Sequence, residues 1–306
     1  MSSFIFSRIL QAIPVVLIII TLTFFMVRLA PGGPFDQERA ISESAKEAIN
    51  KQYGLDKPLI IQFGNYLKGV FQGDLGPSLS SPGRKVQDII ADKFPNSLQL
   101  GLYSLLFAIC VGVPAGLIAS LKQNSWLDYI PMTSAMIGIC LPTFVIGPVL
   151  SLIFGVWLGW LPVLGWSGGA EYKVLPTVTL GLAYAAYIAR LTRGGMLEIL
   201  GQDYIRTAWA KGASTFSVVF KHAFRGGIMP VVSFLGPALA GLISGSFVVE
   251  TIFVIPGLGQ EFVKSALNRD YFLVLGTVLF YQVLIISVNI AVDVAVVWLY
   301  PRAKFD

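Results

Sequence analysis

Residues 204–230 read YIRTAWAKGASTFSVVFKHAFRGGIMP, a basic stretch with helical spacing in a chain otherwise dominated by apolar runs. Of the 306 residues, 55% are hydrophobic and only 13% are charged, whereas soluble domains carry about 25% charged residues. This deficit of charge indicates a membrane protein. The basic stretch must then lie in water beside the membrane.

A membrane-spanning helix needs about 20 mainly apolar residues. Six stretches meet this requirement and predict an all-α integral membrane protein with six transmembrane helices: 9–29, 98–121, 132–158, 174–192, 228–249 and 272–299. Pro142 and Pro148 interrupt the third stretch. The fourth ends at Arg190 and Arg193, which mark the boundary with water because an arginine at the centre of a span costs about 2.5–3.5 kcal/mol.

Lysine and arginine concentrate on one side of the predicted membrane. If the N-terminus is cytoplasmic, the inner segments carry ten of them, and the two short outer loops carry only Lys173, Lys264 and Arg269. Positive residues accumulate on the cytoplasmic side, so both termini and residues 191–227 are expected there. The net charge of +5 then reflects topology rather than nucleic-acid binding.

The outer segment 31–97 contains two helical patterns. Ser42 can cap a helix that Gly54 closes. A second helix, 59–71, is expected to place five apolar side chains near one face: Ile60, Phe63, Leu67, Val70 and Phe71. Such a stripe suits either the lipid headgroup boundary or a packed cap over a pore mouth, and the cap is favoured.

Residues 191–227 are expected to form a helical hairpin. The first helix runs from about Met196 to Lys211 and carries Ile205, Ala208 and Trp209 on one side. Gly212 suits the position just beyond its end, where the backbone often turns left-handed.

The second helix of the hairpin is capped by Ser214 or Thr215 and ends at Gly226 and Gly227. Four apolar residues in it follow helical spacing: Phe216, Val219, Phe220 and Ala223. An apolar ridge on a cytoplasmic loop has to be buried against lipid, the protein's own spans, or the groove of a soluble partner. The positive residues scatter around both helices rather than forming one lipid-facing stripe, which favours a partner.

The hairpin resembles the EAA loop of bacterial ABC-importer permeases, in the variant found in the peptide-permease family. That variant is close to YIRTA-x-AKG followed by a His-Ala pair and a proline, and the matching residues are Tyr204, Ile205, Arg206, Thr207, Ala208, Ala210, Lys211, Gly212, His222, Ala223 and Pro230. The chain departs from the general EAA pattern, as the peptide branch does, because RTA replaces EAA. RLAPG at 28–32, GDLGPS at 73–78 and the 250–276 stretch resemble the same branch.

The resemblance implies a type I ABC importer permease fold with cytoplasmic termini. Residues 1–93 would hold the first transmembrane helix and an extracytoplasmic segment, and 94–301 the permease core. The resemblance also implies half of an oligopeptide pore, completed by a second homologous permease subunit in the bacterial inner membrane. Two cytoplasmic ATPases would bind ATP and Mg²⁺, and an extracytoplasmic binding protein would deliver peptides. The hairpin residues implied to contact the ATPase are Tyr204, Ile205, Arg206, Thr207, Ala208, Lys211, Gly212, Phe216, Phe220 and His222.

The chain lacks the motifs of the common catalytic sites. It contains no GxxxxGK[ST] or HExxH, and His222 is its only histidine. Cys110 and Cys140 lie 30 residues apart in apolar stretches, without the spacing of a metal site. The sequence therefore predicts a transport subunit that is not an enzyme and holds no cofactor or metal of its own.

Polar residues within spans are candidates for function. Five are singled out as pore or subunit-interface candidates: Ser244, Ser246, Glu250, Asn289 and Asp293. Glu250 is expected to pair with a cation outside the membrane. Small residues in 236–246 would allow close helix approach at a subunit seam or a gate.

Other functions stay open on the residues alone. A permease of the same family for dipeptides, nickel, haem or antimicrobial peptides fits the motifs equally well. A secondary transporter would need carboxylates at mid-span, and only Asp293 comes near this position.

Overall fold

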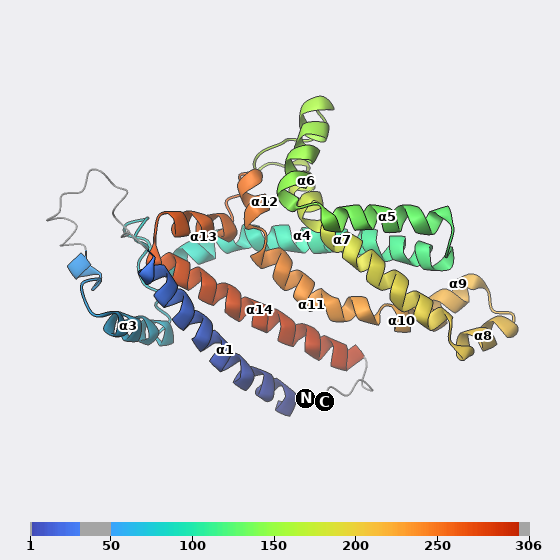
Figure 1. Ribbon diagram of the computed structural model, residues 1–306, viewed down its shortest axis with the longest axis horizontal. Coiled ribbons are helices and arrows are strands. Elements are labelled where there is room, and N and C mark those ends of the chain that lie inside the picture. The colour runs from blue at the N-terminus through green and yellow to red at the C-terminus, as the bar shows by residue number, and fades with distance from the viewer. Residues whose placement is uncertain (1, 31–49, 300–306) are drawn as a thin grey trace. The chain divides into compact units, whose positions relative to one another are not determined.

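The computed structural model describes residues 2–30 and 50–299, and within them the chain is helical, with no strand pairing beyond an isolated bridge between Pro77 and Lys85. The helices form two compact units. One comprises the described residues up to Asn96 together with Pro256–Ser287, and the other comprises Ser97–Ile255 and the described residues from Val288 onward. In chain order (Figure 1) the helices are α1 (Ser2–Leu29), α3 (Leu59–Phe71), α4 (Val86–Leu121), α5 (Trp126–Cys140), α6 (Thr143–Leu150), the π-helix η1 (Ser151–Trp157), α7 (Glu171–Leu200), α8 (Asp203–Ala210), α9 (Thr215–Ser217), the π-helix η2 (Val218–Ala223), α10 (Phe224–Gly227), α11 (Met229–Ser244), α12 (Phe247–Ile252), α13 (Leu258–Leu267) and α14 (Tyr271–Leu299).

The predicted spans correspond to apolar helices in the described part of the chain. Five segments are long and apolar enough to cross a membrane: 6–29, 86–121, 171–200, 229–252 and 271–294. The second begins earlier than predicted, and at about 1.5 Å per residue its length of about 54 Å exceeds the roughly 30 Å hydrocarbon core. One end of α4 therefore extends beyond the apolar layer.

The third predicted span is not one straight helix. α5 and the α6–η1 segment meet at an angle of 110°. The break falls at Leu141 and Pro142, where Leu141 is extended with φ −82° and ψ 124°. A proline disfavours the helical conformation of the residue before it and has no N–H to donate. Pro142 therefore bends this segment sharply, whereas Pro148, which was also expected to interrupt it, lies within α6.

In the first unit, α3 has the predicted bounds, but only part of the predicted apolar face is packed. Ile60 and Phe71 are 70% and 82% exposed, whereas Gln62 and Tyr66 are buried. Phe63, Leu67 and Val70 pack beside Tyr66 against Phe24 of α1 and Leu275 of α14. The packed face is thus centred on Gln62 and Tyr66. Gln62 can be buried although it is polar, because its side-chain amide donates hydrogen bonds to the carbonyls of Leu55 and Lys57.

The helix predicted to start at Ser42 lies mostly outside the described residues, but its predicted end is confirmed. Gly54 has φ +64°. Its N–H donates to the carbonyl of Lys51, and the N–H of Leu55 donates to that of Asn50. These two bonds form a Schellman motif, which needs a left-handed residue that glycine adopts without strain.

Asp270 organises the start of α14. Its buried carboxylate accepts a hydrogen bond from the N–H of Leu273, which caps the helix. The other carboxylate oxygen accepts from the hydroxyl of Ser78 and from both the N–H and hydroxyl of Ser80. One side chain therefore ties the 78–80 loop to α14 and satisfies its own buried charge.

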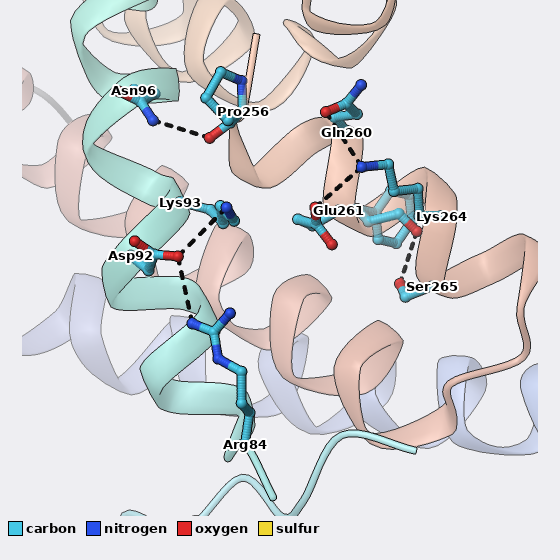
Figure 2. Close-up of polar contacts among 10 residues, drawn as sticks. Arg84, Asp92, Lys93, Asn96, Pro256, Gln260, Glu261, Lys264 and Ser265 are labelled. Carbon is cyan, nitrogen blue, oxygen red and sulfur yellow. Dashed lines mark hydrogen bonds and ion pairs between the residues drawn. The ribbon is translucent and has the colours of Figure 1, made fainter. Parts of the chain in front are cut away.

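Charged side chains mark the polar ends of α4 and α13 (Figure 2). Asp92 pairs with Arg84 at 3.3 Å and with Lys93 at 3.4 Å. On α13, Lys264 pairs with Glu261 at 3.3 Å. The charges on α4 lie in its first turns, which agrees with this end standing clear of the apolar layer.

In the second unit, α4 and α7 approach one another through small residues. A Cβ added to Gly112 would lie 2.5 Å from the carbonyl oxygen of Ala185. One added to Gly116 would lie 2.3 Å from that of Ala189 and 2.7 Å from Cβ of Thr192. Gly112 and Gly116 form a GxxxG pattern, which lets membrane helices pack backbone to backbone. We call this contact the α4–α7 seam.

The α4–α7 seam predicts that Gly116→Ala destabilises the protein by about 1–3 kcal/mol, because even a methyl group has no room. Gly194→Ala on α7 is the matched control, since nothing lies within 4 Å of its added Cβ. Thermal unfolding in detergent, followed by fluorescence-detected gel filtration, measures both. Equal midpoints for the two variants would show that the seam tolerates side chains.

Candidate functional site

The hairpin begins later than predicted. α7 continues through Met196 to Leu200, and a turn at Gly201 separates it from α8. Gln202 is extended with φ −75° and ψ 149° and precedes the first helical residue, Asp203. The predicted helix from Met196 to Lys211 is therefore two helices. Figure 1 shows α8 and α9 beyond the C-terminal end of α7, at the opposite end of that helix from α6 and α12.

The turn between the two arms of the hairpin has the predicted geometry. Gly212 has φ +77°. Its N–H donates to the carbonyl of Trp209, and the N–H of Ala213 donates to that of Ala208. This is again a Schellman motif, so glycine here meets a backbone requirement. Ser214 is the cap of α9, and its Oγ accepts from the N–H of Ser217 at 3.4 Å.

The inner face of the hairpin forms its own apolar cluster. Ile205 of α8 packs with Met196 of α7 and with three residues of η2, Val218, Val219 and Ala223, all essentially inaccessible to solvent. Gly195 and Gly227 let α10 lie directly on α7, since a Cβ on Gly195 would lie 2.3 Å from the carbonyl oxygen of Gly227. The hairpin is therefore fixed to the end of α7.

The predicted apolar ridge divides between two faces. Val219 and Ala223 point inward, but Phe216 and Phe220 are 71% and 47% exposed. The cause is local, because residues 218–223 form a π-helix rather than an α-helix. Hydrogen bonds between residues five apart widen the turn, and Val218 takes an inner position that α-helical spacing does not assign to it.

The outer face of the hairpin combines exposed aromatic rings with positive charge. The ring centroids of Phe216 and Phe220 lie 4.6 Å apart, and those of Phe220 and Phe224 lie 6.0 Å apart. Arg206 pairs with Asp203 at 3.6 Å across the surface of α8. The other exposed hairpin residues singled out from the sequence are Tyr204, Thr207, Trp209, Lys211, Gly212, Lys221, His222 and Arg225. Of the predicted contact residues, Ile205 is buried and Ala208 is half-buried, so both support this face from within.

A charged clamp holds α5 to α7 near the base of the hairpin. Nε and Nη2 of Arg193 donate to the two carboxylate oxygens of Asp128 at 2.6 and 2.7 Å. The Asp128 side chain is 3% exposed and that of Arg193 is 27% exposed. The N–H of Asn124 also donates to Asp128. The sequence indicates Arg193 only as a boundary marker and does not single out Asp128, although an acidic residue three positions after Ser125 is a helix-start signal.

Glu250 lies in the interior rather than at an exposed end. It is fully buried, and one carboxylate oxygen accepts from the hydroxyls of Ser97 and Ser246 at 2.7 and 2.5 Å. Ser97 comes from α4 and Ser246 from the break between α11 and α12, so Glu250 joins these elements. Two of its partners are thus hydroxyl donors, and its pairing with a cation stays a prediction.

The other polar candidates do not gather around Glu250. Ser244 donates to the carbonyl of Ala240 within α11. Asn289 and Asp293 are half-buried on α14. Asn289 faces α11, because a Cβ on Gly236 would lie 3.2 Å from its Oδ1. The small residues of 236–246 thus allow close packing inside this chain, and their use at a subunit seam stays a prediction.

Residues 112–305 match the family described as the binding-protein-dependent transport system inner membrane component, and residues 1–101 match the N-terminal region of such membrane components. The chain belongs to this family. It is therefore a multi-pass protein of the bacterial inner membrane and a component of a transport system that works with a binding protein. The predicted family, location and transport role are confirmed.

Curated relatives match along the whole chain. The oligopeptide transport system permease protein OppB of Haemophilus influenzae is 46% identical over 306 residues, and that of Escherichia coli K12 is 45% identical, each covering 100% of both chains. The dipeptide transport system permease protein DppB of Bacillus subtilis is 41% identical and covers 99% of this chain and 98% of its own.

Solved structures of ABC transporters share the fold. The MetNI methionine ABC transporter in an inward-facing conformation matches with a TM-score of 0.58 and 19% identity, over 70% of this chain and 97% of its own. An amino acid ABC transporter matches with a TM-score of 0.54 and 13% identity, over 68% and 93% of the two chains. At such identities the likeness concerns the fold, and it confirms the predicted type I ABC importer permease class.

The Asp128–Arg193 clamp predicts a large loss of stability when one partner is removed. Asp128→Asn and Arg193→Gln should each cost about 3 kcal/mol, because either leaves a largely buried group without its partner. Arg206→Gln is the control and should cost at most about 1 kcal/mol, since its ion pair with Asp203 is exposed. Thermal unfolding of the single and double variants gives the coupling energy, and additive effects at positions 128 and 193 would contradict the clamp.

Proposed function

We propose that this chain is a permease subunit of an ATP-driven oligopeptide importer and forms half of its translocation path. A second, homologous permease subunit forms the other half. Two cytoplasmic ATPase subunits bind ATP and Mg²⁺, and a peptide-binding protein outside the membrane delivers the cargo. In this proposal residues 1–93 carry the first span and an extracytoplasmic segment, 94–301 form the permease core, and both termini are cytoplasmic.

The single observation that carries the cargo assignment is the graded similarity to the relatives. Permeases named for oligopeptides are 45–46% identical over the entire chain. The relatives named for dipeptides and for glutathione reach 41% and 39%. A long peptide needs a roomy, wet path with weak contacts to backbone and termini, because strong contacts would slow its release.

We assign the contact with the ATPase to the outer face of the hairpin. Stacked, exposed rings of Phe216 and Phe220 present apolar surface that a groove can bury. Lys211 and Lys221 are exposed on the same hairpin and suit an acidic rim. A Cβ added to Gly212, at the left-handed turn, would meet no heavy atom within 4 Å, so a partner can approach the backbone there closely.

The base of the hairpin is suited to passing a displacement into the membrane. The Asp128–Arg193 clamp and the contact of Gly195 with Gly227 join α5, α7 and α10. A pull on the hairpin would then move these helices as one body. In the path itself, we propose that the polar candidates act at two places: Ser244, Ser246 and Glu250 at the break after α11, and Asn289 with Asp293 on α14.

The coupling role is tested by Phe216→Ala and Phe220→Ala. Each should leave membrane insertion and thermal stability unchanged, because the rings are exposed, but should weaken retention of the ATPase subunits about tenfold or more and reduce peptide uptake. Co-purification and transport in vesicles measure these effects. Phe71→Ala on α3 is the control, since Phe71 is also exposed but lies outside the hairpin. ATPase retention equal to that of Phe71→Ala would refute the assignment.

The cargo is tested by competition uptake in vesicles that contain the complete importer. Peptides of four or five residues should displace a labelled oligopeptide more strongly than dipeptides, nickel or haem. Uptake that only dipeptides inhibit would overturn the cargo while leaving the coupling assignment intact. Transport by this chain alone, driven by an ion gradient, would overturn both.

A further inference from the structure

A cavity of about 210 Å³ in the first unit has no role in the proposed transport mechanism. It lies where the end of α1 meets α3, the loop after α3 and the start of α14. Figure 1 shows the end of α1 beside the start of α14. The lining residues that matter for its chemistry are Arg28, Tyr66, Asp74 and Phe272.

Arg28 contributes a guanidinium group whose hydrogen-bonding capacity is only partly used. Its Nη1 donates to Oε1 of Gln62. Its guanidinium carbon Cζ lies 4.3 Å from the ring centroid of Tyr271 and 5.3 Å from that of Phe24. The rings stabilise the charge, but they offer no acceptor to the buried Nε, which has no hydrogen-bond partner among the described residues. A buried N–H without a partner carries a cost that a ligand oxygen would remove.

Tyr66 brings a second unused donor to the same cavity. Its side chain is 6% exposed, and its hydroxyl has no partner among the described residues. Burial raises the pKa of the phenol, so the hydroxyl stays protonated and able to donate. Two donors, one of them charged, belong to residues that line the same cavity from α1 and α3, and this combination suits an anionic oxygen ligand.

The acidic residue in the cavity wall is already engaged elsewhere. Asp74 accepts from the N–H of Gly76 at 3.1 Å and pairs with Lys85 at 3.5 Å. The hydrogen bond from Gly76, aided by Lys85, lowers the pKa of Asp74. Within the described residues no ion pair joins Asp74 to Arg28. The described lining of the cavity therefore lacks a hydrogen-bond acceptor for Nε of Arg28 and the hydroxyl of Tyr66.

The surroundings of Arg28 favour a lipid as the source of that acceptor. Arg28 directly follows the charge-free run of α1, and an arginine at the end of a span lies at headgroup level. Met26 and Leu29 beside it are more than 70% exposed, and Ile60 of α3 is 70% exposed. These apolar side chains suit the acyl chains of the same molecule.

We propose that this cavity binds the phosphate group of a phospholipid headgroup, with Arg28 and Tyr66 donating to the phosphate oxygens and the acyl chains lying along the exposed side of α1. A bound lipid would then fasten α3 to α1 at the membrane surface. Inorganic phosphate offers the same oxygen chemistry, so the experiment compares the two sources.

The test is thermal unfolding of the full chain in detergent with three additives: short-chain phosphatidylglycerol, short-chain diacylglycerol, and inorganic phosphate. Phosphatidylglycerol in about hundredfold excess over its Kd should raise the midpoint of the wild-type chain by about 3 °C or more. Diacylglycerol should not, because it lacks the phosphate. An equal rise with inorganic phosphate would assign the site to a free anion and exclude the lipid.

Variants separate the site from general stability. Arg28→Gln should abolish the rise, and Tyr66→Phe, which keeps the packing of the ring, should reduce it about threefold or more. Arg84→Gln is the matched control, since this arginine is exposed and pairs with Asp92. A response in Arg28→Gln, or in Tyr66→Phe, equal to that of the wild type would overturn the proposal.

Discussion

In the second unit, α4 and α7 pack backbone to backbone, and α7 carries the candidate site. Helices in lipid gain little from apolar side chains alone, because the lipid is equally apolar, so close backbone packing has to hold them. At the α4–α7 seam the glycines of α4 lie against carbonyl oxygens of α7, at distances that exclude any side chain. α7 carries the hairpin at its C-terminal end. The position of the hairpin therefore rests on the absence of side chains at Gly112 and Gly116.

Three buried acidic side chains join helices and loops that lie far apart along the chain. Asp128 links α5 to α7 through Arg193, Glu250 links α12 to α4 through Ser97, and Asp270 links α14 to the 78–80 loop. A polar group in the interior is tolerated only when it is hydrogen-bonded or paired. Each of these acidic side chains therefore favours one arrangement of its elements, since another arrangement would leave its oxygens without donors.

The hairpin has one face packed against α7 and another face that is exposed. Its inner side chains are buried against α7, and its outer rings, Phe216 and Phe220, are exposed. The π-helix makes this division possible, because its wider turn lets Val218, Val219 and Ala223 face inward while Phe216 and Phe220 face outward. A membrane component of a transport system with a binding protein needs such an outward face if a cytoplasmic partner is to move it. The proposed lipid site at Arg28 would add a second fixed point, on the unit that holds α1 and α3.

Sequence alone determined the features that arise from neighbours along the chain. Apolar runs define the spans, Pro142 breaks one of them, and Gly54 and Gly212 end helices, because hydrophobic length and backbone conformation are local properties. The family likewise followed from short motifs. Only the tertiary structure decided which faces are buried. Phe216 is exposed beside a π-helix, and residue spacing does not reveal this helix type. Gln62 and Glu250 are buried because they find hydrogen-bond partners in other segments of the fold. Asp128 was missed for this reason, since its partner Arg193 lies 65 residues further along the chain.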